Sequence, residues 1–126
     1  MSNKAQNPKS KKYDLAERTA KFGENVIDFV SSLPETSVNR PLKSQMIRSG
    51  TSVGANYMEA DAAESGRDFN HKIALCKKEA KETTHWLRMI AKANPNKTEK
   101  CRKLYQEARE LTLIFSSILN KRKKKA

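Results

Sequence analysis

The strongest constraint on the fold is a regular apolar repeat over residues 69–90. Small and apolar side chains recur there at alternating spacings of four and three residues, and they are Phe69, Ile73, Cys76, Ala80, Thr83, Leu87 and Ile90. A period of about 3.5 residues keeps all of them on one side of an α-helix. The segment is therefore predicted to be a long helix that crosses neighbouring helices at a shallow angle, near 20°.

Three other segments show the same spacing. The first is expected to begin at Asp14, with Glu17 completing a capping box, and to end at Pro34. The second is expected over residues 40–65, and the fourth follows a break at residues 94–96. We call the residues at these spacings the stripe of each helix. The stripe of the first helix is Leu15, Thr19, Phe22, Val26, Phe29 and Leu33, and that of the second is Leu42, Met46, Ser49, Val53, Tyr57 and Ala60. The stripe of the fourth is Cys101, Leu104, Ala108, Leu111, Phe115, Ile118 and Arg122.

Four helices with short loops predict an all-α fold, arranged as an up-down-up-down antiparallel four-helix bundle over residues 13–120. Residues 1–12 are interpreted as a disordered basic arm, and residues 121–126 as a basic C-terminal tail. Several apolar residues, including Ile27 and Leu113, lie off the stripes. They indicate either a second buried surface used in self-association or stripes that are simply wide.

Positive charge gathers at the chain ends and on the third predicted helix. Of the net charge of +12, residues 1–12 and 121–125 supply nine. When successive residues of the third helix are placed 100° apart around its axis, five cations fall on one side. Glu79 and Glu82 fall on the neighbouring side, which forms an acidic flank. The cations are Lys77, Lys78, Lys81, Arg88 and Lys92. They span roughly 22 Å, comparable with several successive phosphates, but they could equally form a solvated face paired with neighbouring acids.

Catalytic and metal-binding groups do not converge in the sequence. His71 and His85 are the only histidines, and 14 residues of helix separate them by about 21 Å. Cys76 and Cys101 lie on apolar stripes, which indicates core thiols in a reducing compartment. No apolar run is long enough to span a bilayer, and the N-terminus lacks a signal peptide. We therefore expect a cytoplasmic protein with no catalytic site, metal, cofactor or membrane partner.

The stretch RSGTSVGANYMEA at residues 48–60 holds two glycines four residues apart, Gly50 and Gly54. It is not a phosphate-binding loop, because no strand is expected before it and no Gly-Lys-Ser/Thr ending follows. Each glycine costs a helix about 1 kcal/mol relative to alanine. Their spacing puts both on one helix face, which favours close packing against another helix over a kink.

Three segments resemble the four-helix-bundle proteins encoded in intervening sequences of bacterial 23S ribosomal RNA genes. The segments are YDLAERT at 13–19, IRSGTSVGANYMEA at 47–60 and DFNHKIALCKKEAKETTHWLRMI at 68–90, and the resemblance extends from residue 13 to about residue 119. Members of that family assemble as ring-like homopentamers. A related branch, the accessory variability protein of diversity-generating retroelements, binds nucleic acid and a reverse transcriptase. The resemblance therefore implies a homopentamer with a nucleic-acid role, and it transfers no catalytic motif.

The leading hypothesis is a non-enzymatic, homo-oligomeric protein that binds nucleic acid, RNA above all, through the phosphate backbone. No aromatic residue interleaves the cations of the third helix, so backbone or shape recognition is expected. The candidate contacts are Lys77, Lys78, Lys81, Arg88, Lys92, Lys121, Arg122, Lys123, Lys124 and Lys125. The alternative is a protein-interaction scaffold or accessory subunit, for example one that docks a reverse transcriptase. An enzyme would require Glu59, Glu64 and a histidine to converge in a pocket.

Overall fold

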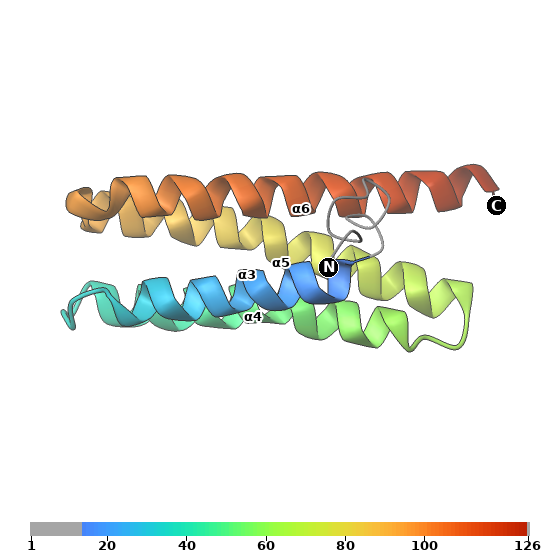
Figure 1. Cartoon of the computed structure of the whole chain (residues 1–126), viewed down its shortest axis with the longest axis horizontal. Coiled ribbons are helices and arrows are strands. Elements are labelled where there is room, and N and C mark those ends of the chain that lie inside the picture. Colours follow the sequence, from blue (N-terminus) through green and yellow to red (C-terminus); the bar gives the residue numbers. More distant parts are fainter. Residues whose placement is uncertain (1–13, 126) are drawn as a thin grey trace, which may run out of the picture.

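The computed structural model describes residues 14–125, which form helices and no strands. The helices are α3 (Leu15–Ser31), α4 (Asn39–Asp61), α5 (Gly66–Ala93) and α6 (Thr98–Lys125), and a short 3-10 helix, Pro95–Lys97, leads into α6. Successive helices run antiparallel and pack side by side (Figure 1). The predicted all-α four-helix bundle is thus confirmed over these residues. The expected arm at residues 1–12 lies outside them.

The predicted stripes form the core of the bundle. Every member of the first and third stripes is buried except Phe69, which is half-buried. The members of the other two stripes are also buried, apart from four that are half-buried: Leu42, Tyr57, Ile118 and Arg122. Off the stripes, Val30 is buried whereas Ile27 and Leu113 are exposed. Apolar periodicity therefore identified the inward face of each helix.

The helix ends are fixed in different ways. Asp14 occupies the N-cap of α3 but makes no capping hydrogen bond, so the expected capping box is wrong. Its backbone (φ −108°, ψ 36°) is not in the extended conformation that aims a capping side chain at the first turn. Ser65, by contrast, caps α5 by accepting a hydrogen bond from the Asp68 backbone N–H at 3.1 Å. At the other end of the bundle, the buried amides of Asn39 and Asn94 exchange two hydrogen bonds of 2.9 Å, which join α4 to α5.

Gly50 and Gly54 lie on the side of α4 that faces α3, and α4 continues through both. A Cβ atom on Gly50 would lie 2.8 Å from a methyl group of Val26. A Cβ atom on Gly54 would lie 3.3 Å from the carbonyl oxygen of Thr19. Separations this short leave little room for a side chain, so the glycines allow α4 to approach α3 closely.

The four helices surround the core in the order α3, α4, α5, α6, with close packing at three of the four edges. The α3–α6 edge is sparser and contains an open groove of about 740 Å³ lined mostly by polar side chains. Arg18 crosses this edge and lies 2.7 Å from Glu107 and 2.9 Å from Glu110. Its hydrogen bond with Glu107 raises the pKa of Arg18. It follows from the order of packing that the α3/α4 and α5/α6 faces lie on opposite sides of the bundle.

Candidate nucleic-acid interface

The five cations predicted on α5, hereafter the basic strip (Lys77, Lys78, Lys81, Arg88 and Lys92), lie off the buried stripe. Lys77 is half-buried and the other four are exposed. None of the five forms an ion pair with another residue of the described chain. The exposed His85 lies among them, and its ring forms a T-shaped pair with the ring of Trp86 at a centroid distance of 4.9 Å. The strip therefore presents five positive charges that nothing in residues 14–125 neutralises at contact distance.

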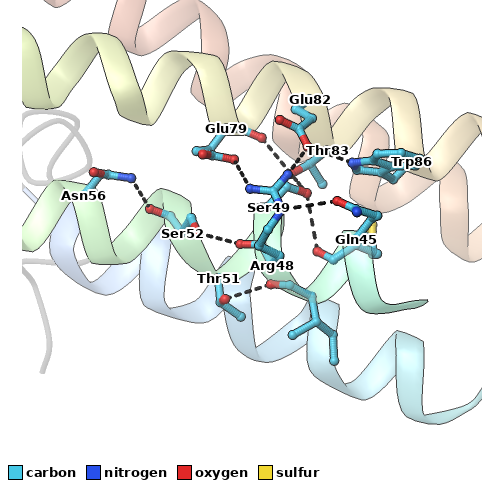
Figure 2. Close-up of polar contacts among 12 residues, drawn as sticks. Gln45, Arg48, Ser49, Thr51, Ser52, Asn56, Glu79, Glu82, Thr83 and Trp86 are labelled. Atoms are coloured by element: carbon cyan, nitrogen blue, oxygen red, sulfur yellow. Dashed lines mark hydrogen bonds and ion pairs between the residues drawn. The ribbon is translucent and has the colours of Figure 1, made fainter. Parts of the chain in front are cut away.

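The acidic flank of α5 lies toward α4 and is already occupied. Arg48 of α4 places one guanidinium nitrogen 3.2 Å from Glu79 and another in contact with Glu82. The indole N–H of Trp86 donates to Glu82 at 3.0 Å. Figure 2 shows Arg48 close to both carboxylates, with Trp86 beside Glu82. These two acids are bound within the fold and do not pair with the basic strip.

A buried hydrogen bond lies behind this charged cluster. The hydroxyl oxygens of Ser49 and Thr83 are 2.9 Å apart, and both residues are fully buried. Thr83 also donates to the backbone carbonyl of Glu79 at 2.8 Å, in the preceding turn (Figure 2). The two most distinctive sequence motifs, at residues 47–60 and 68–90, thus meet along the α4–α5 edge. Their contacts hold α5, the helix that carries the basic strip, against α4.

The surface beside the basic strip belongs to α6. Arg88 lines a shallow hollow of about 190 Å³ together with Arg102 and Tyr105 of α6. Tyr105 is 41% exposed, and Arg102 forms an ion pair with Glu99 at 2.6 Å. Arg109 lies one turn beyond Tyr105 on the same side of α6 and is exposed. The spacing of 102, 105 and 109 marks one helix face in the sequence, but only the packing of α6 on α5 puts that face beside the strip.

The basic tail continues α6 to Lys125 and lies near the start of α5. Lys121 and Lys123 are exposed, whereas Arg122 is half-buried. The Arg122 guanidinium donates to Asn70 at 2.5 Å and lies over the Phe69 ring, 4.9 Å from its centroid. These contacts hold Arg122 within the fold, which makes it less available to a phosphate than the exposed Lys121 and Lys123. The side chains of Lys124 and Lys125 lie outside the described part of the chain.

The basic tail lies near one end of the basic strip, the end at Lys77. Asn70, which holds Arg122, precedes Lys77 by seven residues, or about 10 Å along the helix axis. The two basic segments are far apart in sequence, and the antiparallel packing of α5 on α6 brings them together (Figure 1). A ligand on the strip could therefore also reach Lys121 and Lys123.

Other groups with catalytic potential are dispersed or occupied. Glu59 pairs with Lys72 at 2.6 Å, and His71 is exposed. Within the described chain, His, Cys, Asp and Glu side chains nowhere gather in threes that could hold a metal ion. Burial raises the pKa of the Cys76 thiol to about 12, and burial also raises the pKa of the Cys101 thiol. Both thiols stay protonated near neutral pH, as expected of core residues.

The structure thus defines an antiparallel four-helix bundle with an unpaired basic strip on α5. The family of 23S rRNA-intervening sequence proteins matches residues 11–117, and the chain belongs to that family. This confirms the resemblance drawn from the sequence motifs. None of the helices in residues 14–125 has the length and apolar character that a bilayer crossing requires.

A solved structure with a similar fold supports this assignment. It is the crystal structure of a protein with unknown function from the S23 ribosomal protein family of Bacteroides thetaiotaomicron VPI-5482. The two chains share 29% sequence identity with a TM-score of 0.73, over 82% of this chain and 96% of that one. No protein with curated function matches the chain.

Proposed function

We propose that this protein is a non-enzymatic RNA-binding protein that contacts the phosphate backbone through the basic strip of α5. The observation that carries the proposal is the contrast between the unpaired cations of the strip and the paired acids on its flank, Glu79 and Glu82. Arg48 forms ion pairs with both Glu79 and Glu82, while the strip has no ion-pair partner among the described residues. Unpaired cations in a row of about 22 Å suit an extended polyanion. The family name refers to intervening sequences of 23S rRNA, which makes structured RNA the first ligand to test.

The test is the affinity of an RNA hairpin for a variant in which three of the five cations of the strip are reversed in charge. The triple substitution Lys77→Glu, Lys81→Glu and Arg88→Glu should weaken binding at least a hundredfold, because each lost phosphate contact becomes a repulsion. The wild-type affinity should fall steeply with salt, and the slope of log K against log salt should flatten in single-lysine variants.

A matched control variant reverses three positive charges outside the basic strip. Lys21, Lys100 and Lys103 are exposed cations beside the α3–α6 edge, and none pairs with an acid in the described chain. Their triple substitution to glutamate gives the same net charge and should keep affinity within a few-fold of wild type. Equal loss in both triple variants would show that binding follows total charge and that the strip is not a site.

We also propose that the protein self-associates through its α3/α4 face, the homopentamer implied by the family resemblance being the expected assembly. Three exposed apolar residues lie on these helices: Ile27, Ile47 and Met58 at 44%, 37% and 59% exposure. Ile27 and Met58 border a shallow groove lined with small residues such as Ala20 and Gly23. Assembly there would leave the basic strip on the opposite side free. The native mass of wild type and of the double variant Ile27→Glu/Met58→Glu tests this, and an unchanged mass would reject the interface.

A further inference from the structure

The hollow between α5 and α6 combines an exposed aromatic ring with a free cation. Tyr105 is 41% exposed and lies at one side of the hollow. The apolar residues Leu87, Ala91 and Cys101 also line it, together with Thr98 and Arg102. Arg88, the member of the basic strip on this hollow, has no ion-pair partner in the described chain. An apolar hollow beside an unneutralised cation suits a ligand that is both flat and anionic.

An unpaired nucleotide has this combination of properties. Its base offers a flat π-face for stacking on a tyrosine, and its phosphates need cations on either side. A base inside a duplex cannot enter such a hollow, because both of its faces are stacked on neighbouring bases. The charge around the hollow is complementary to a phosphate chain: Arg88 lies on α5, and the exposed Arg109 follows Tyr105 by one turn on α6.

We propose that the hollow between α5 and α6 receives one unpaired base of a bound RNA, stacked on Tyr105, with the flanking phosphates on Arg88 and Arg109. This inference rests on the proposed RNA-binding function and deepens it. It specifies RNA with a single-stranded loop, bulge or end as the ligand. It also places the unpaired segment toward the C-terminal end of α5, because Arg88 lies near that end of the strip.

The experiment compares two RNA probes with the full chain. One is a single-stranded oligonucleotide that carries the fluorescent base 2-aminopurine, and the other is a blunt RNA duplex without unpaired bases. Tyr105→Ala should weaken binding of the single strand about tenfold and abolish the stacking-induced quenching of 2-aminopurine. The affinity for the duplex and the salt dependence should stay at wild-type values, because no phosphate contact is removed.

Two control variants separate stacking from general effects. Tyr105→Phe keeps the ring and should retain both the affinity and the quenching. Leu113→Ala removes another exposed apolar side chain of α6, which is 59% exposed, and should change neither. Thermal unfolding of each variant, followed by circular dichroism, checks that the helices are intact.

The possible outcomes distinguish this inference from the function on which it rests. If wild type binds both probes and Tyr105→Ala binds the single strand equally well, the stacking site is wrong while RNA binding stands. If Tyr105→Ala weakens both probes alike, Tyr105 supports the fold and the inference is again wrong. If wild type binds neither probe but binds a glutamate-rich peptide, the surface docks a protein, and both proposals fail.

Discussion

Two edges of the bundle use the same kind of ion-pair cluster but differ in what lies behind it. At the α4–α5 edge, Arg48 contacts two glutamates of α5. At the α3–α6 edge, Arg18 contacts two glutamates of α6. The pairs are Glu79 with Glu82 and Glu107 with Glu110. A spacing of three residues presents both carboxylates of each pair on one helix face.

Behind Arg48 the helices are packed closely, whereas Arg18 stands beside an open groove. The α4–α5 edge contains the buried hydroxyl pair of Ser49 and Thr83 among fully buried apolar residues such as Met46 and Ala80. The α3–α6 edge has few contacts beyond Arg18 and is open to solvent over the groove. Partly exposed ion pairs contribute little free energy by themselves. Burial therefore makes the α4–α5 edge the stable centre, and the α3–α6 edge is where the bundle should open first.

The largest effect should come from forcing α4 away from α3. Gly50→Leu places a side chain where Val26, itself fully buried, already lies within 2.8 Å of a Cβ position. Overpacking of this kind should lower the free energy of unfolding by about 3 kcal/mol. Urea denaturation at fixed protein concentration measures it. Ser44→Leu, at an exposed position of the same helix, should change stability by no more than about 0.5 kcal/mol. A Gly50→Leu variant as stable as Ser44→Leu would contradict the close approach of α4 to α3.

A smaller loss is expected from the buried hydroxyl pair of the α4–α5 edge. Thr83→Val keeps the side-chain shape but leaves the Ser49 hydroxyl with only a 3.4 Å contact to the carbonyl of Met46. Leaving a buried polar group without a hydrogen-bond partner should lower the free energy of unfolding by about 1–2 kcal/mol. The double variant Ser49→Ala/Thr83→Val removes both partners and should recover much of that loss. If the two substitutions are simply additive in thermal unfolding, the hydroxyl pair does not couple α4 to α5.

The stability of the α4–α5 edge could be predicted from the sequence only in part. The 4-3 spacing placed Thr83 and Ser49 on inward stripes, because periodicity reports which face of a helix is buried. It could not show that they hydrogen-bond to each other, since that depends on the rotation and register of two helices. The same limit applies to Arg48, whose glutamate partners lie 31 and 34 residues away in sequence.

The candidate interface, too, could be predicted from the sequence only in part. The five cations of the strip could be identified by adding 100° per residue along one helix. The nearby Tyr105 could not, because it belongs to α6 and lines the same hollow as Arg88 only through the packing of α6 on α5. Arg122 was predicted as a phosphate contact from its place in a basic run, yet its guanidinium binds Asn70 and covers Phe69. Charge patterns within one segment do not reveal which charges the fold itself uses.

The smallest effects should come from the two arginines, and they test the comparison directly. Arg18→Ala should lower global stability by at most about 1 kcal/mol, because its side chain is 26% exposed. Its clearer consequence should be local: with little else holding α3 to α6, amide hydrogens of α3 should exchange faster while those of α5 do not change. Arg48→Ala should lower global stability by less, because the Arg48 side chain is 46% exposed. It should leave local exchange unaltered, because the close packing of α4 on α5 remains.

Hydrogen exchange followed by mass spectrometry measures both variants. High salt should reproduce part of the Arg18→Ala pattern in wild type by screening the same ion pairs. If both variants speed exchange equally, the ion pairs and not the buried contacts hold the two edges, and the distinction between them is lost.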